Sequence, residues 1–305
     1  MNPSEKQHIT VLPDDYHFFR FSWFQLMRPL TFTGTISPIL AGTAFAALKG
    51  NVRLDLLFFL LAASILIQAA ANMLNDYFDF CNGQDQDRWQ TKQHTGPAHH
   101  HIPTVALFLI GVAAMLGIWL ASESNWIIIP IGMIGIAVGF FYSAGRYSLS
   151  ALGLGELTAA IYLGVIPTLL AYIIQGNSID TGIFAVALPY ALLIALMILS
   201  NNIRDIQKDA DFRSTLAIKL GRKKAAYLHA TMLLFTYVTV FLLIATQLIH
   251  WTAVSVILAA PFSWRLYSAY RLDATRSMEI AGMKWSALHH WVFGLLLSIG
   301  IWIGG

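Results

Sequence analysis

The sequence predicts an all-α polytopic membrane protein, with about nine transmembrane helices around a central cavity. Three observations support this fold class. Only 11% of the 305 residues are charged and 57% are hydrophobic, whereas a soluble domain normally carries about 25% charged residues. The apolar residues form blocks of bilayer length, and the basic residues gather in every second connection between the blocks.

A transmembrane helix needs roughly 20 mostly apolar residues. Nine segments fit this length, and the glycines and prolines in several of them are tolerated where neighbouring helices satisfy the freed backbone groups. The segments are residues 29–48, 54–74, 103–121, 125–143, 152–174, 183–201, 225–246, 251–268 and 287–303. We therefore expect a polar N-terminal tail, residues 1–23, followed by a membrane domain, residues 24–305.

The tail has no apolar core, so it is not expected to be a cleavable signal peptide. The single cysteine, Cys81, excludes an intramolecular disulfide. Seventeen of the 19 Lys and Arg residues fall on the side of the nine spans that holds the N-terminus, and only Lys49 and Arg53 fall on the other.

Cytoplasmic loops of membrane proteins carry an excess of Lys and Arg. The sequence therefore predicts a multi-pass protein of the cell membrane, with its N-terminus in the cytoplasm and its C-terminus outside. The loops near 75–102 and 202–224, and the opening of the cavity, are expected on the cytoplasmic side. The lipid bilayer is an expected partner, and nucleic acid is not.

Two of these cytoplasmic connections contain seven of the 16 acidic residues. In the first connection, Asn72, Asp76 and Asp79 stand at i, i+4 and i+7. This spacing places the three side chains on one face of a helix that runs off the cytoplasmic end of a span. We call the segment from Asn72 to Asp87 the first acidic motif.

The second connection repeats the arrangement. Asn201, Asp205 and Asp209 stand at i, i+4 and i+8, so this helix also presents a stripe of amide and carboxylate oxygens. We call the segment from Asn201 to Asp211 the second acidic motif. The alternative interpretation, solvated ends of helices, applies best to Asp87 and Asp211.

Carboxylates at membrane depth are costly and usually mark a functional cavity. No equal set of lysines accompanies these acids, so the sequence predicts that Mg²⁺ neutralises them, because this ion bridges carboxylates to substrate phosphates. Two stripes predict two or more Mg²⁺ ions that hold a diphosphate. Arg204 could direct its guanidinium group at phosphate oxygens, while Arg222, Lys223 and Lys224 are expected to contact anionic lipid.

At these residues the chain resembles the UbiA superfamily of intramembrane aromatic prenyltransferases, and within it the 1,4-dihydroxy-2-naphthoate polyprenyltransferases. The resemblance covers the chain from about residue 24, and that family's nine helices agree with the predicted number of spans. The matching residues are Arg28-Pro29, Asn75-Asp76-Tyr77-Phe78-Asp79 with Gly83 and Asp85, Gly153-Leu154-Gly155-Glu156, Ser200-Asn201-Asn202-Ile203-Arg204-Asp205-Ile206 with Asp209, Thr215-Leu216-Ala217-Ile218 and Leu220-Gly221-Arg222.

The resemblance implies Mg-dependent transfer of a polyprenyl group from its diphosphate to an aromatic ring, 1,4-dihydroxy-2-naphthoate in the menaquinone pathway. Basic side chains would stabilise charge on the departing diphosphate, and Tyr142 would present its ring to the allylic cation. The predicted metal ligands are Asn75, Asp76, Asp79, Asp205 and Asp209. The predicted catalytic residues are Asp76, Asp79, Asp205, Asp209, Arg204 and Tyr142. The predicted substrate-binding residues are Arg28, Asn72, Asn75, Asp85, Asn201, Asn202, Arg146, Arg213 and Lys219.

Three segments depart from the family pattern. The segment from Asp209 to Thr215 lacks a glycine and is one residue shorter, so Arg213 is expected to take the basic role there. Gly145–Ser148 replaces a proline-containing stretch, and His94–His101 replaces a glycine-rich loop with an arginine. These last two segments are expected to border the ring pocket, so the identity of the acceptor stays open.

Three alternatives remain at this stage: a prenyltransferase with a different acceptor, a non-catalytic paralogue that binds a prenyl lipid, and an ion-coupled transporter. Transporters place ionisable groups near the bilayer midplane and contain internal repeats. Here the acids gather at one face of the membrane, which argues against a transporter. Magnesium-dependent release of diphosphate separates the enzyme from the other two classes.

Overall fold

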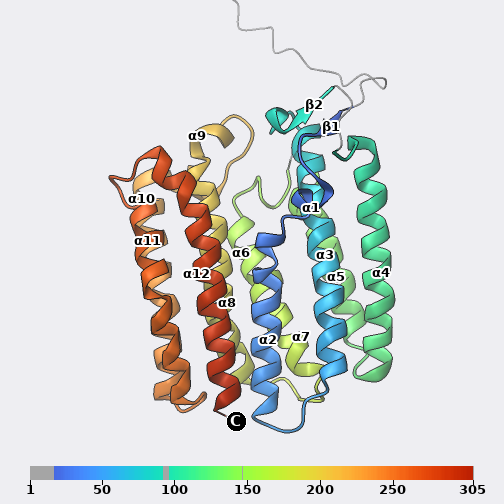
Figure 1. Ribbon diagram of the computed structural model, residues 1–305, viewed down its shortest axis with the longest axis vertical. Helices are drawn as coiled ribbons and strands as arrows, with labels where there is room; N and C mark the ends of the chain where they lie inside the picture. Colours follow the sequence, from blue (N-terminus) through green and yellow to red (C-terminus); the bar gives the residue numbers. More distant parts are fainter. Residues whose placement is uncertain (1–16, 92–95, 146, 305) are drawn as a thin grey trace, which may run out of the picture.

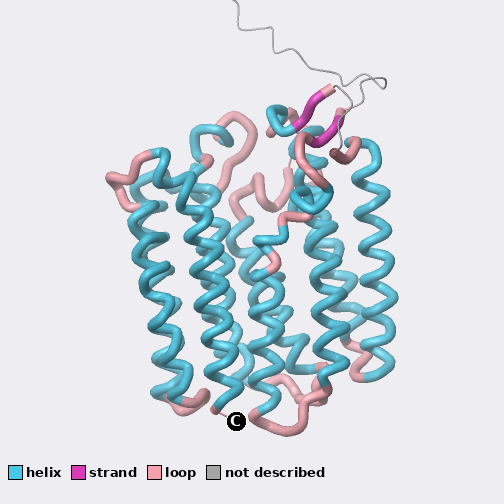
Figure 2. The backbone as a smooth tube through the Cα atoms, in the orientation of Figure 1, coloured by secondary structure: helices cyan, strands magenta, loops and turns pink. Residues whose placement is uncertain are grey.

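The computed structural model describes residues 17–91, 96–145 and 147–304. In these ranges the protein is mostly helical, with long helices that stand side by side and one small sheet at one end of the bundle (Figures 1 and 2). The sheet consists of β1 (Phe18–Phe19) and β2 (Trp89–Gln90), which pair antiparallel with Phe19 opposite Trp89. Strand β1 lies within the segment that the sequence predicts as an N-terminal tail.

The first half of the described chain contains five α-helices and three short 3₁₀ turns. The elements are α1 (Trp23–Leu26), η1 (Pro29–Thr31), α2 (Thr33–Ala47), α3 (Leu54–Cys81), η2 (Gln86–Arg88), η3 (His99–His101), α4 (Ile102–Glu123) and α5 (Ile128–Ser143).

The second half begins with a span built from three consecutive pieces, one of which is a π-helix. The elements are α6 (Gly155–Ala159), the π-helical η4 (Ala160–Val165), α7 (Ile166–Ile173), α8 (Thr181–Arg204), α9 (Ile206–Asp209), α10 (Leu216–Ala245), the 3₁₀ helix η5 (Trp251–Ala259), α11 (Ala260–Tyr270) and α12 (Arg276–Ile303).

Every segment predicted as a span lies in helix, but the number of nine spans is not confirmed. Six helices of the described chain are long and apolar enough to cross a membrane, and a seventh is possible if the pair Trp23–Thr31 and Thr33–Ala47, bent by 45°, acts as one span. Helix α5 is apolar but has only 16 residues. The segment from Trp251 to Tyr270 is divided between η5 and α11.

Helix α8 lies at the centre of the core. Its Tyr190 is fully buried and donates a hydrogen bond to the carbonyl oxygen of Gly294 in α12 (3.0 Å). Small residues allow close helix approach in membranes, and Gly42 shows this most clearly: a Cβ atom there would lie 2.1 Å from the carbonyl oxygen of Thr168. The core therefore fixes α2, α7, α8 and α12 against one another.

The two acidic motifs lie at the same end of this bundle. Helices α3 and α8 both end there, next to α9 and the β1–β2 sheet, whereas the C-terminus lies at the opposite end (Figure 1). The fold thus brings together two segments that are about 130 residues apart in the sequence.

Candidate active site

Asp76 lies at the centre of the first acidic motif and is 1% exposed. Its Oδ1 accepts a hydrogen bond from Nη2 of Arg28 (2.7 Å) and another from Nη1 of Arg88. Its Oδ2 is buried and has no hydrogen-bond partner in the described ranges. A buried carboxylate is stable only when it is paired, and here the two guanidinium groups provide the partners.

Asp79 lies one helical turn further on and joins the two motifs. Its Oδ1 accepts a hydrogen bond from Nη2 of Arg213, which follows the second motif, and its Oδ2 accepts one from Nδ2 of Asn75 (2.9 Å). Nε of Arg213 also donates to Oε1 of Gln84 (2.8 Å). The structure therefore places Arg213 against the first acidic motif, and its role at a diphosphate stays a prediction.

A second ion pair also connects the motifs. Nζ of Lys208 in α9 donates to Oδ1 of Asp85, which has a left-handed backbone (φ 51°). Burial alone would raise the pKa of the Asp85 carboxyl, but the hydrogen bond and charge of Lys208 lower it below its ordinary value. Asp85 is therefore held as a carboxylate at the surface of the site.

The i, i+4, i+8 spacing of the second acidic motif suggested one continuous helix, but the structure divides the motif between two helices. Helix α8 ends at Arg204 and α9 begins at Ile206, with Asp205 between them (φ −103°, ψ 12°). The stripe survives, because the N–H of Asp205 still bonds to the carbonyl of Asn201 (3.1 Å) and that of Asp209 bonds to the carbonyl of Asp205 (2.9 Å).

Arg204 contacts its own motif in this structure. Its Nε donates to Oδ1 of Asp205 (2.9 Å), and its Nη2 donates to Oδ1 of Asn201 (2.6 Å). Burial raises the pKa of the Asp209 carboxyl to about 6, and the nearby Asp205 and Asp79 carboxylates reinforce this shift against the opposing charge of Arg213. Asp209 thus binds a proton more readily than an ordinary aspartate does.

Asn72 has a different contact from the one its spacing suggested. Its Nδ2 donates to the carbonyl oxygen of Met27 (2.8 Å) and to Oγ1 of Thr31 (3.0 Å). Both acceptors flank Arg28, which has a left-handed backbone (φ 54°) at the start of η1. In the described structure Asn72 thus holds the short segment that directs Arg28 at Asp76.

Tyr142 lies near the end of α5 (Ile128–Ser143). Its hydroxyl is within electrostatic reach of Arg213, Asp79 and Glu156. Lys219 contacts the connection before α6, because its Nζ donates to the carbonyl oxygen of Leu152 (2.6 Å). Asn202 donates to Glu156 (2.9 Å). Arg146 and His94, which the sequence places near the ring pocket, lie outside the described residues.

Two arginines belong to the site that sequence reasoning did not select. Arg88 pairs with Asp76, and its guanidinium group lies 5.1 Å from the ring centroid of Phe19 in β1. Nη2 of Arg276, at the start of α12, lies 3.6 Å from Oδ1 of Asp205. In the sequence, both residues contributed only to the excess of positive charge predicted for the cytoplasmic side. Nothing in the neighbouring sequence indicates which residues they pair with.

The carboxylate and amide oxygens of the two motifs are the type of ligand that a hard cation binds. Within the described ranges, no group of three or more His, Cys, Asp or Glu side chains forms a metal site by itself. Mg²⁺, however, commonly uses only one or two carboxylates together with water and substrate phosphates. The unpartnered Oδ2 of Asp76, beside the amide and carboxylate oxygens of Asn75 and Asp79, fits that manner of binding.

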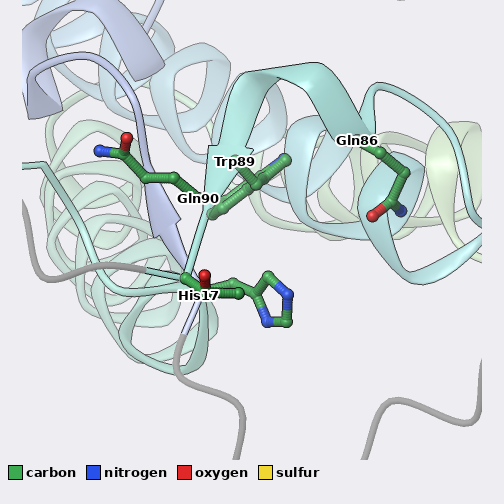
Figure 3. A pocket seen from close by; sticks show the side chains of 5 residues that line it. His17, Gln86, Trp89 and Gln90 are labelled. Carbon is green, nitrogen blue, oxygen red and sulfur yellow. The ribbon is translucent and has the colours of Figure 1, made fainter.

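His99, from the histidine run, and one pocket lie near this site. The ring of His99 stacks on Tyr77 (4.4 Å between centroids) and lies edge-on to Trp89 (5.0 Å), so this histidine packs among aromatic rings. Figure 3 shows a pocket of about 390 Å³ beside β2, lined by His17, Gln86, Trp89, Gln90 and Thr91. None of the predicted site residues lines this pocket, so the predicted central cavity and its orientation are not confirmed.

The fold and the site define a multi-pass helical membrane protein with a buried cluster of acids and guanidinium groups at one end of its helices. Residues 35–288 match the UbiA prenyltransferase family. The chain belongs to that family and is a prenyltransferase.

The relatives agree in fold and in length. The chain is 32% identical to a 1,4-dihydroxy-2-naphthoate octaprenyltransferase from Bacillus subtilis (strain 168), over 99% of both chains. It is similar in fold to the apo structure of a UbiA homolog from Aeropyrum pernix K1 (TM-score 0.65, 13% identity, 89% of this chain and 97% of that one). It is also similar to a UbiA homolog from Archaeoglobus fulgidus bound to DMAPP and Mg²⁺ (TM-score 0.58, 15% identity, 92% and 100%).

Proposed function

We propose that this prenyltransferase moves a polyprenyl group from its diphosphate to 1,4-dihydroxy-2-naphthoate, a step of menaquinone biosynthesis, with Mg²⁺ as cofactor. The main support is the buried Arg213–Asp79 ion pair, which joins the segment after the second acidic motif to the first motif, together with the Arg28–Asp76 pair at the first motif. The identity of 32% with a 1,4-dihydroxy-2-naphthoate octaprenyltransferase over 99% of both chains supports the acceptor.

The arginines explain how the chain would bind the donor. Guanidinium groups match phosphate oxygens in a two-pronged geometry, and Arg28, Arg88 and Arg213 enter the site from three different segments. In the described structure the carboxylates occupy these donors. A diphosphate would take over guanidinium contacts, and the released carboxylate oxygens would become available to cations.

The residues that would hold Mg²⁺ are Asn75, Asp76, Asp79, Asp205 and Asp209. When bound, this ion would supply positive charge to the leaving diphosphate. Arg204, held against Asp205, would stabilise the same charge from the second motif. Tyr142 lies within electrostatic reach of Asp79 and Arg213, and its ring would face the prenyl carbon that becomes cationic.

We further propose that the end of the bundle with the two motifs faces the cytoplasm of a cell-membrane protein. The distribution of Lys and Arg supports this orientation, because 17 of the 19 fall on the motif side of the predicted spans. The arrangement in Figure 1, with both motifs at one end and the C-terminus at the other, is compatible with it. Water-soluble substrates would then enter from the cytoplasm.

The direct test is an assay of the purified protein in lipid. Prenyl diphosphates of several lengths and a panel of hydroxylated aromatic acids would be supplied, with Mg²⁺ or with a chelator. We expect a prenylated naphthoate-derived product by mass spectrometry, with Mg²⁺-dependent release of diphosphate. Transfer to a different ring would correct the acceptor, and binding of prenyl diphosphate without any product would contradict the proposed activity.

A further inference from the structure

Glu156 is a buried carboxylate with one oxygen unused. It lies in the first turn of α6 and is 5% exposed. Its Oε1 accepts a hydrogen bond from Nδ2 of Asn202 in the second acidic motif (2.9 Å). Its Oε2 has no hydrogen-bond partner in the described part of the chain. A buried acceptor without a partner is costly and in native proteins usually indicates a missing ligand, water or ion.

The position of Glu156 relative to the ion pairs is well defined. A Cβ atom built at the neighbouring Gly155 would lie 3.3 Å from the hydroxyl of Tyr142, and that hydroxyl interacts electrostatically with Glu156, Asp79 and Arg213. Tyr142 thus lies close both to Glu156 and to the Asp79–Arg213 pair.

The connection before α6 fixes this arrangement. The N–H of Ser214, next to Arg213, donates to the carbonyl of Ala151 (2.8 Å). Gly153, with a left-handed backbone (φ 76°), turns the chain into α6, and a Cβ atom there would lie 2.8 Å from the carbonyl oxygen of Ser214. The segment that carries Arg213 therefore positions the helix that carries Glu156.

We propose that Glu156 is the residue that binds the ring hydroxyl of the acceptor, through Oε2, and takes its proton during transfer. This inference rests on the proposed function. A hydroxylated ring needs an acceptor for its O–H group in a buried site, and a hydroxyl that loses its proton becomes a stronger carbon nucleophile at the neighbouring ring position. Glu156 offers this contact near Tyr142 and near the groups proposed to bind the diphosphate.

The transfer step forms one carbon–carbon bond and breaks one carbon–oxygen bond. A bond forms between the ring carbon and C1 of the prenyl chain, and the bond between C1 and the diphosphate oxygen breaks, so its electron pair leaves with the diphosphate. The hydroxyl proton moves to Oε2 of Glu156, and the ring oxygen becomes a carbonyl oxygen. Asn202 holds Oε1 throughout, so it acts as a positioning residue that directs Oε2 at the ring.

Glu156→Gln is the matched variant, because its amide oxygen can still accept the hydrogen bond from Asn202. General acid–base groups contribute about 10²–10⁴-fold to rate, so we expect kcat/KM for 1,4-dihydroxy-2-naphthoate to fall by about 100-fold or more. The KM for prenyl diphosphate should stay within about threefold, since the variant removes no group proposed to bind it. Glu123→Gln, at the opposite end of the bundle, is the control and should behave as wild type.

The two monomethyl ethers of the acceptor separate a chemical role from a structural one. One ether removes the hydroxyl that contacts Glu156, so wild type should lose activity on it and Glu156→Gln should lose little more, as in a double-mutant cycle. On the other ether, the variant should lose as much as on the parent compound. Equal losses of the variant on all three acceptors, or wild-type kinetics, would overturn the role of Glu156 and leave the proposed function intact. No transfer by wild type itself would overturn the proposed function and this inference with it.

Discussion

The two ends of the helix bundle contain ion pairs of different kinds. At the end with the acidic motifs, the side chains of Asp76 and Asp79 are 1% and 8% exposed, and that of Arg213 is 14% exposed. At the opposite end, the side chains of the Lys49–Asp180 pair are 42% and 38% exposed. The Asp76 and Asp79 carboxylates are therefore removed from water, whereas both partners of the Lys49–Asp180 pair remain in contact with it.

Under the proposed function, this difference distinguishes charges that bind substrate from charges at the edge of the fold. Exposed ion pairs are typically worth about 0–1 kcal/mol, and they cost little to form. Buried pairs carry a desolvation penalty that can exceed their attraction. A buried set joining two distant motifs, with an unpartnered oxygen on Asp76, is better explained by substrate binding than by stability.

The largest effect is expected at Asp76. Asp76→Asn keeps the shape but removes the charge that faces Arg28 and Arg88, and we expect turnover to fall on the order of 10³-fold or more, since preorganised charge is usually the dominant catalytic term. Product formation by mass spectrometry measures this loss, with the amount of inserted protein as reference. Asp55→Asn, at the opposite end, is the matched control. Near-normal turnover in Asp76→Asn would remove the functional distinction between the two ends.

The second-largest effect is expected at Arg213. Arg213→Gln removes a charged donor to the proposed diphosphate site, and hydrogen bonds to charged groups are worth about 1.5–3 kcal/mol. We therefore expect the KM for prenyl diphosphate to rise about 10- to 100-fold, with a smaller rise in Arg213→Lys because an ammonium lacks the planar fork. Steady-state kinetics at saturating acceptor would measure this KM. An unchanged KM would mean that Arg213 pairs with Asp79 and does not bind the diphosphate.

Arg276 tests the edge of the motif end, where burial is lower. Its side chain is 54% exposed and its Nη2 lies 3.6 Å from Asp205, so water screens this pair. We expect Arg276→Gln to reduce kcat about threefold to tenfold by loosening Asp205, a modest effect suited to a partly exposed pair. A loss as large as that of Asp76→Asn would show that Arg276 contacts substrate directly.

The smallest effect is expected at the opposite end. Arg53 pairs with Asp55 and Glu123, and all three side chains are more than 40% exposed. Arg53→Ala should leave turnover within about twofold of wild type, because solvent and salt screen such pairs. Melting temperature and turnover, measured at low and high salt, check this expectation. A large loss of turnover would mean that the two ends are coupled through the bundle.

The local pattern of the sequence was sufficient for much of this protein. Apolar blocks of bilayer length predicted helix at each of the proposed spans, because hydrophobic length depends on neighbouring residues alone. The spacing of Asn72, Asp76 and Asp79 on one helix predicted a common face for the same reason. The family also followed from the two motifs, which are short continuous segments.

Tertiary structure decided the partners. Asp76 takes Arg28, 48 residues away, and Asp79 takes Arg213, 134 residues away; such pairs depend on how helices pack, which no local spacing records. It also placed the break at Asp205, divided the segment from Trp251 to Tyr270 between two helix types, and set Glu156 against Asn202. Sequence alone therefore determined the family, and it predicted which residues are candidates for the chemistry. Close packing of helices at small residues such as Gly42 determined which of them meet.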